Sequence, residues 1–449
     1  MSDHCRDIQR SKTTSSAFLL SRSEPCGPSP EYGPGSDEAA AWMIETLSGA
    51  FSEVVPPGRL IEMASSELAA ENRFAAMVIR FDELGLSSGP EAVVVDTAAV
   101  LDEFCSEKGG FWGIFDADIL ACFIAGRDSS VCNKIAQAVS SKLAEQRNDT
   151  VTVGITEYPL LEYRREQTLE NARKALEHAE FFGPGSLVVF DSVSLNISGD
   201  KYYQAGHIDS AIAEFKKALA LDPQNVNVLN SLGVCHGVRE AFEKALECFT
   251  RAMELDPKEI MAVYNSGYVH LCLGNYEKAL ELFLLAGQID ENLFEAAFQT
   301  GRIYMETGRP GLARKFLEKA VNLNKGSGAA FRYLGDCYSA VDRDEDAAAA
   351  YKTALKLRPD DAEALSALGF LYEMQNRNAD IALMFCRRAV EMYPENPVFR
   401  HRLGRVSYNR GLHEQALSEF EAAMELGHED SEEYVEILRP TGGKKESVK

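Results

Sequence analysis

The chain has 449 residues, more than one ordinary hydrophobic core accommodates, so two or more domains are expected. Its hydrophobic fraction of 45% is typical of a globular protein, whereas 69 acidic residues against 46 basic ones give a net charge of −23. Nucleic-acid phosphates repel so acidic a chain, which argues against a protein that binds a nucleic-acid backbone.

Cysteine and histidine usage gives no sign of a metal or disulfide site. The ten cysteines are scattered without a CxxC pair, and the eight histidines lack the spacing of metal ligands. The first forty residues lack a basic-then-apolar leader, and no run of about 18 apolar residues occurs. These features predict a cytoplasmic protein with reduced thiols, no membrane span and no cofactor.

The first 72 residues divide into two regions. Residues 1–36 are rich in Ser, Pro and Gly and poor in apolar periodicity, which predicts a disordered head. Residues 37–72 contain two helical patterns, DEAAAWMIETLSGAF and GRLIEMASSELAAEN, separated by Pro56 and Pro57. We expect these helices to lead into the first folded domain.

Between residues 73 and 191 the hydrophobic periodicity alternates between strand and helix. The expected order is strand, helix, strand, strand, helix, strand, followed by the helix LENARKALEHAEFF and the strand SLVVFD. This order predicts a single antiparallel sheet with helices on one face, the α+β ferredoxin-like plan.

Two acidic residues, Asp116 and Asp118, lie in the tight connection between the second and third expected strands. Aspartate is a common hairpin residue, so the pattern favours a turn alone. The alternative is a metal site that these two carboxylates would form together with Asp82. The chain has no GxSxG, GxxxxGK[ST] or GxGxxG motif.

From residue 192 onward the sequence repeats itself every 34 residues. Alanines follow the repeated glycines by twelve and nineteen positions, and these small residues let two helices of a hairpin approach closely. Bulky residues such as Phe215, four positions after the first alanine, are expected to meet the next hairpin. One residue is inserted near Asn378. The repeated glycines are Gly199, Gly233, Gly267, Gly301, Gly335, Gly369 and Gly404.

These units resemble tetratricopeptide repeats, seven of them at residues 192–429, followed by a capping helix at 430–440 and a basic tail at 441–449. The resemblance implies an all-α superhelical solenoid whose first helices line a groove for a protein or peptide partner. Aromatic residues in the middle units and Arg or His toward the end favour a ligand with an apolar segment and acidic groups. Each position is equally compatible with packing between hairpins. The groove positions of the family hold Asn227, Asn230, Tyr264, Tyr268, Phe298, Arg302, Arg332, Asp336, Phe370, His401 and Arg405.

The segment ARKALEHAEFFGPGSLVVFD resembles the final helix and strand of GGDEF (diguanylate cyclase) domains, which implies a nucleotide-cyclase-type domain at residues 73–191. The position of the metal-binding aspartate is held by Arg80, and that of the phosphate-binding lysine by Glu180. The signature turn would fall near Asp118, without the glycines that let backbone amides approach a triphosphate.

We therefore expect a degenerate, inactive domain that serves in sensing, homodimerisation or capping of the solenoid. The whole chain is then a non-enzymatic scaffold that recruits a protein partner. The alternative is an active cyclase that uses Mg²⁺ and GTP, carries Asp82, Asp116 and Asp118 in its site, and is regulated by the solenoid.

Overall fold

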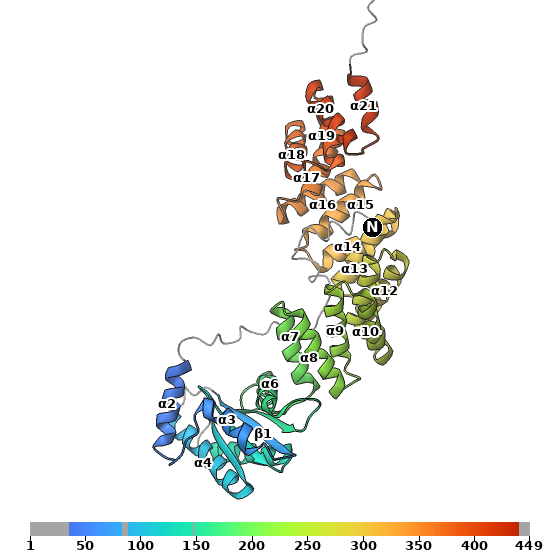
Figure 1. The fold of residues 1–449 in the computed structure, drawn as a ribbon. Helices are drawn as coiled ribbons and strands as arrows, with labels where there is room; N and C mark the ends of the chain where they lie inside the picture. Colours follow the sequence, from blue (N-terminus) through green and yellow to red (C-terminus); the bar gives the residue numbers. More distant parts are fainter. Residues whose placement is uncertain (1–35, 83–88, 147–148, 440–449) are drawn as a thin grey trace, which may run out of the picture. The chain divides into compact units, whose positions relative to one another are not determined.

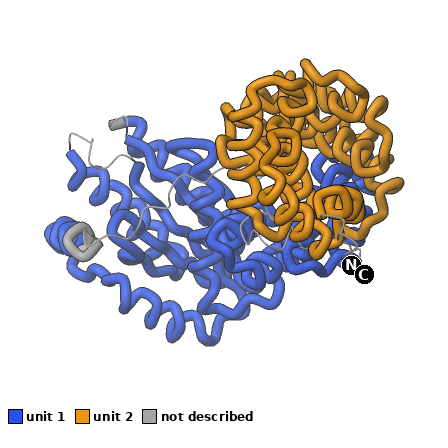
Figure 2. The backbone as a smooth tube through the Cα atoms, turned by 90° about the horizontal axis from the view of Figure 1, so that it is seen from above, with its two compact units in different colours: residues 1–269 blue, residues 270–449 orange. Residues whose placement is uncertain are grey.

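The computed structural model describes residues 36–82, 89–146 and 149–439. The chain divides within one helix into two compact units, residues 1–269 and 270–449, and each is considered by itself (Figure 2). The expected disordered head, apart from its last residue, and the basic tail lie outside the described residues. None of the helices in the described ranges is long and apolar enough to cross a membrane.

The first unit begins with the two expected helices, α2 (Ser36–Ser48) and α3 (Pro57–Glu67) (Figure 1). Helix α3 starts directly after Pro56, with a second proline at its first position, where no backbone N–H is needed. The two helices bury apolar side chains in different cores, since Met43 of α2 and Leu60 of α3 lie on opposite sides of the sheet described next.

Five strands form one mixed sheet in the order β2-β3-β1-β4-β5. The first four pair antiparallel, as expected, but β5 pairs parallel to β4, so the expectation of a wholly antiparallel sheet is wrong. The cause is a helical crossover between β4 and β5, which returns the chain in the same direction. The strands are β1 (Phe74–Phe81), β2 (Gly110–Asp116), β3 (Ile119–Ala125), β4 (Val151–Tyr158) and β5 (Leu187–Val189).

Helices cover both faces of this sheet, whereas the sequence predicted helices on one face. Met77 and Ile79 of β1 lie in a core with α2, α4 (Pro90–Lys108) and α5 (Ser129–Gln146). Ala76 and Val78 lie in a second core with α3 and α6 (Thr168–Glu180). Strand β1 is apolar at nearly every position, so each of its faces needs a cover.

Seven helix pairs follow between residues 192 and 425, as the repeat predicted, and a further helix follows them. The first helix of the first pair begins at Ser192. The helices are, in chain order, α7 (Ser192–Gln204), α8 (Ile208–Leu221), α9 (Val226–Val238), α10 (Phe242–Leu255), α11 (Ile260–Cys272), α12 (Tyr276–Ile289), α13 (Phe294–Glu306), α14 (Pro310–Leu323), α15 (Gly328–Ser339), α16 (Asp344–Leu357), α17 (Ala362–Met374), α18 (Ala379–Met392), α19 (Pro397–Asn409), α20 (His413–Glu425) and α21 (Ser431–Leu438).

The repeated glycines make room for the bulky residue of the second helix. A Cβ on Gly199 would lie 2.4 Å from a ring carbon of Phe215, and one on Gly233 would lie 2.5 Å from the ring of Phe249. Phe215 therefore packs against the glycine of its own hairpin. The ring also shares a core with Val228 and Leu232 of the next pair, so it joins the two.

The inserted residue of the sixth pair is absorbed in the turn between its helices. Asn376 has φ 50°, a left-handed conformation that Glu240 and Asp342 also adopt in other such turns. Asn378 adds a second left-handed residue, again with φ 50°, directly before α18. Asparagine tolerates this conformation better than most residues, so the insertion leaves the helices intact.

Candidate partner-binding surfaces

Asp82, one of the three carboxylates of the possible metal site, is fully engaged within the sheet domain. Its carboxylate accepts hydrogen bonds from Thr150 Oγ1 at 2.9 Å, Thr152 Oγ1 at 2.8 Å and the backbone N–H of Gly185 at 2.8 Å. These contacts tie the start of β4 to the loop before β5. Asp82 therefore stabilises the fold with the oxygens that a metal ion would need.

Asp116 and Asp118 form the turn between β2 and β3. Asp116 Oδ1 accepts from the N–H of Ala117 at 2.8 Å, and the carbonyl of Asp118 accepts from the N–H of Phe81 at 3.3 Å. Burial raises the pKa of the Asp118 carboxyl, the Arg80 guanidinium opposes this shift, and Asp116 adds to it. Within the described residues, no group of three or more His, Cys, Asp or Glu side chains could hold a metal ion.

The two reversed charges of the cyclase resemblance pair with each other. Arg80 Nη1 of β1 donates to Glu180 Oε1 at the end of α6, and both side chains are partly exposed. A cation at the metal position and an anion at the phosphate position would each repel their ligand, but together they neutralise one another. The two side chains that the resemblance assigns to the metal and phosphate positions are thus engaged with each other.

In the first unit, three of the four expected groove residues lie in the interior of the repeats. Asn227 is exposed, whereas Asn230, Tyr264 and Tyr268 are buried. Asn265 Nδ2 donates to Asn230 Oδ1 at 2.9 Å, which joins the first helices of two neighbouring pairs. The buried three stabilise the stack of helices.

Two expected groove residues of the second unit are also buried. Phe298 stacks on Phe294, with ring centroids 5.7 Å apart, and meets the edge of Tyr333 at 5.6 Å. His401 Nδ1 lies 2.9 Å from Ser431 Oγ, and its ring stacks at 4.1 Å on His428. Burial, with nearby cationic groups, lowers the pKa of His401 to about 4, so the neutral ring holds α21 against the last helix pair.

Two arginines of the second unit are paired with carboxylates of their own chain. Arg302 Nε lies 3.1 Å from Glu306 Oε1, one turn further along α13. Arg332 lies 3.4 Å from Asp336 and 3.6 Å from Asp361, and the carboxylate of Asp336 also accepts from Tyr351 Oη at 2.7 Å. These guanidinium groups are partly neutralised and have little charge left for a ligand.

Two other arginines lie over Phe370 and form no direct ion pair with a carboxylate of the described residues, although the charge of Arg402 also acts on the Asp336 carboxyl and opposes the rise in its pKa. The Arg405 guanidinium lies over the Phe370 ring at 5.0 Å, and its Nη2 lies 3.5 Å from Met374 Sδ. Arg402 lies over the same ring at 5.7 Å and donates to Ser366 Oγ at 3.3 Å. These contacts join the first helices α17 and α19. We refer to Phe370, Arg402 and Arg405 as the arginine–phenylalanine face.

Arg402 was missed by the sequence reasoning, because it occupies the sixth position of its unit, outside the four positions that line the groove in the family. The signal was the segment RHRLGR, which places three arginines on the first helix of the last unit. Arg400, the first of these, pairs with Glu419 at 2.8 Å and so differs from the other two.

Comparison with known proteins identifies the helical region. Family models described as TPR repeat and tetratricopeptide repeat match residues 199–237 and 335–376, residues 238–292, and residues 294–326. A search of curated proteins finds no match.

Three solved structures are similar to parts of the chain. YrrB, a TPR protein with an unusual peptide-binding site, is 22% identical, with a TM-score of 0.38, over 42% of this chain and 96% of its own. PilF of Pseudomonas aeruginosa is 19% identical, with a TM-score of 0.44, over 46% and 95%. A tetratricopeptide repeat protein of Parabacteroides merdae is 19% identical, with a TM-score of 0.40, over 56% and 99%. The helical region of this chain is built of tetratricopeptide repeats.

Proposed function

We propose that this protein is a non-enzymatic interaction scaffold whose second unit binds an acidic segment of a partner protein at the arginine–phenylalanine face. The observation that carries the proposal is the contrast among the arginines of the first helices. Arg302 and Arg332 form ion pairs with carboxylates. Arg402 and Arg405 contact a hydroxyl, a thioether and the rings of Phe370 and Tyr434, and only Arg402 acts electrostatically on a carboxylate, that of Asp336.

The chemistry of this face defines the class of ligand. A guanidinium group binds a carboxylate through two parallel hydrogen bonds, and such charge-assisted bonds are about twice as strong as neutral ones. Both guanidinium groups lie over the ring of the half-buried Phe370, which offers an apolar contact beside them. The ligand expected is therefore a peptide segment with Asp or Glu next to an aromatic or aliphatic side chain.

To test this proposal, a library of random peptides is selected for binding to the full-length protein. The affinities of the selected peptides are then measured. We expect enrichment of acidic peptides and at least about tenfold weaker binding to the variant Arg402→Glu/Arg405→Glu. The matched control is Arg387→Glu/Arg388→Glu, which makes the same charge change at exposed positions of α18. Equal loss in both variants, or selection of peptides without acidic residues, would refute the proposal.

For the sheet domain we propose a degenerate relative of the GGDEF type that does not turn over nucleotide. The Arg80–Glu180 pair and the three hydrogen bonds to Asp82 support this. Full-length protein mixed with GTP and Mg²⁺ should yield no product. Product that disappears in Asp118→Ala would overturn the proposal and favour the cyclase alternative.

A cytoplasmic location and homodimerisation through the sheet domain are further proposals. The scattered spacing of the cysteines, without a CxxC pair, supports a cytoplasmic location. Alkylation of the protein directly after its release from cells should show that its cysteines are reduced. Light scattering of the full chain tests the second, for which a dimer mass is expected.

A further inference from the structure

Helix α6 carries the residue spacing of a repeat's second helix, although it precedes the repeats. Alanine, leucine, alanine and proline occur at Ala172, Leu176, Ala179 and Pro184. The second helices of the repeats have alanine, a bulky residue, alanine and proline at the same intervals. Examples are Ala211, Phe215, Ala218 and Pro223 for α8, and Ala245, Phe249, Ala252 and Pro257 for α10.

Ala172 and Leu176, the first two positions of this spacing, pack on the sheet, whereas Ala179 lies in the core that α6 shares with the repeats. In the repeats, a glycine of the first helix admits the bulky residue. For α6 the glycine is Gly154 of β4, where a Cβ would lie 2.1 Å from the carbonyl oxygen of Ala172 and 2.3 Å from the amide nitrogen of Leu176. Gly154 thus lets the backbone of α6 approach the sheet closely, whereas the repeat glycines make room for a bulky side chain of the second helix.

The adjoining face of α6 packs on the repeats. Ala175 and Ala179 share a hydrophobic core with Leu195 of α7 and Phe215 of α8, and this core continues to Leu232 of α9. Helix α6 contacts α7, and α8 likewise contacts α9. Nine of its thirteen residues are buried, because it is covered on both sides.

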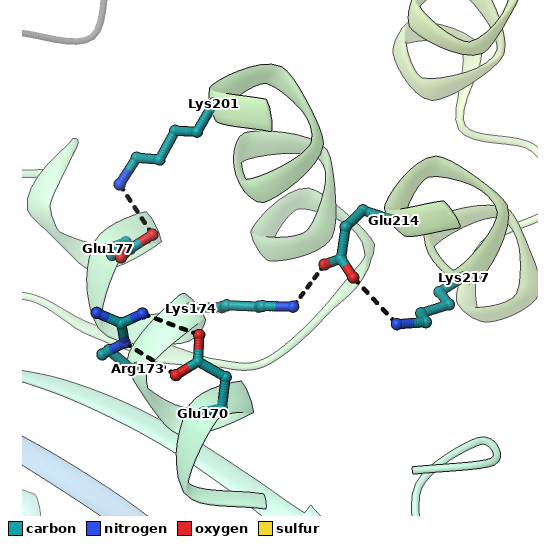
Figure 3. A network of polar contacts seen from close by, with 7 residues as sticks. All are labelled: Glu170, Arg173, Lys174, Glu177, Lys201, Glu214 and Lys217. Atoms are coloured by element: carbon teal, nitrogen blue, oxygen red, sulfur yellow. Dashed lines mark hydrogen bonds and ion pairs between the residues drawn. The ribbon is translucent and has the colours of Figure 1, made fainter. Parts of the chain in front are cut away.

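A buried ion pair fixes α6 to the first repeat (Figure 3). Lys174 Nζ lies 2.5 Å from Glu214 Oε2 of α8, with only 11% and 7% of the two side chains exposed. Lys217 contacts the second oxygen of Glu214 at 3.0 Å, and Glu177 pairs with Lys201 of α7 at 2.8 Å. Separating α6 from the repeat would leave Glu214 with only the more exposed Lys217 as a partner, so the buried Lys174–Glu214 pair resists this separation.

The first residues of α7 are held to α6 as well. Asp191 caps α7 by accepting from the N–H of Ser194 at 2.8 Å. His178 Nδ1 of α6 lies 3.3 Å from the same Asp191 carboxylate and 3.2 Å from Ser194 Oγ. The start of the repeats is thus anchored in the sheet domain.

We infer that α6 is the second helix of an incomplete repeat whose first helix is replaced by the sheet. The sheet domain caps the repeats at their start and unfolds together with α7 and α8. The repeats α7–α10 lack an independent amino-terminal end, since their first hydrophobic layer is supplied by α6. This inference holds whether or not the second unit binds a peptide.

Hydrogen exchange of the full chain in increasing concentrations of urea tests the inference without any substitution. Slowly exchanging amides of β4, α6 and α7–α8 should converge on one unfolding event with the same free energy and urea dependence. If the amides of β4 exchange through a separate event while α7–α8 stay protected, or the reverse, the inference is wrong.

A pair of variants gives an independent test. Lys174→Glu places two negative charges side by side in the interior and should accelerate exchange in β4, α6 and α7–α8 by a common factor of about 100. Lys216→Glu makes the same change at an exposed position of α8 and should leave exchange within about threefold of wild type. Acceleration confined to α7–α8, with β4 unchanged, would contradict a shared unfolding unit.

Discussion

Replacement of Gly335 by alanine tests how the repeat glycines set the distance between helices. An added Cβ would lie 2.6 Å and 2.7 Å from two ring carbons of Tyr351, so the ring has to move by almost an ångström to restore ordinary contact. The ring is buried, and its hydroxyl donates to Asp336 Oδ1 at 2.7 Å, so it cannot move without straining that bond.

The expected loss follows from three contributions. Overpacking a buried site costs about 1–3 kcal/mol, and weakening a hydrogen bond to a carboxylate costs about 1 kcal/mol more. The gain in helix propensity from glycine to alanine offsets about 1 kcal/mol. The free energy of unfolding of the α15–α16 pair should therefore fall by about 2 kcal/mol, which accelerates amide exchange there by about 30-fold.

The matched control is Gly311→Ala in α14, which belongs to the preceding helix pair. No side-chain or backbone atom lies within 4 Å of the added Cβ at this position. This variant should be neutral or slightly more stable than wild type, because only helix propensity changes. Equal amide exchange in the Gly335→Ala and Gly311→Ala variants would refute the account of repeat packing.

Three further predictions concern charged and titratable groups. The folded-state pKa of His401, about 4 against about 6.5 when unfolded, means that the unfolded state binds more protons between these values. The free energy that holds α21 against the last helix pair is therefore at its full value above about pH 6.5 and falls by up to about 3 kcal/mol as the pH falls to 4. Amide exchange in α21 measures this change, and His401→Gln should make it independent of pH. A flat pH profile in wild type would contradict the prediction. Arg80→Glu should lower the free energy of unfolding of the sheet domain by at most about 1 kcal/mol, because the Arg80–Glu180 pair is partly exposed. The charge swap Arg80→Glu/Glu180→Arg should restore most of this free energy. Asp82→Ala should lower the free energy of unfolding of the sheet domain by about 2–3 kcal/mol, since it leaves three donors without their acceptor; an effect as small as that of a surface substitution would show that the bonds contribute nothing.

The repeat was predictable from the sequence because its signals are local and recur. Glycine and alanine spacing defines each hairpin, so all seven pairs follow from one pattern. The strands were predictable for the same reason, since each has its own hydrophobic run. The parallel strand β5 and the second covered face depend instead on where α3 and α6 pack. The nearly continuous apolar run FAAMVIRF was the available sign of a strand covered on both faces.

The candidate site was less predictable, because the position of a residue on a helix indicates where its side chain points but not whether neighbouring helices bury that side chain. Five of the eleven expected groove residues are buried by neighbouring helices, which depends on the side chains of the adjacent repeats. Arg80 and Glu180 were each recognised as reversed charges. Their pairing follows only from the packing of α6 on the sheet, which brings together residues that are 100 positions apart.

Amide exchange of the full chain with and without a saturating selected acidic peptide tests the central claim most directly. Binding at the arginine–phenylalanine face should slow exchange in α17 and α19, and this protection should disappear in Arg402→Glu/Arg405→Glu but persist in Arg387→Glu/Arg388→Glu. Protection elsewhere in the chain with α17 and α19 unchanged, or protection that survives the loss of both arginines, would contradict the proposed scaffold function of this face.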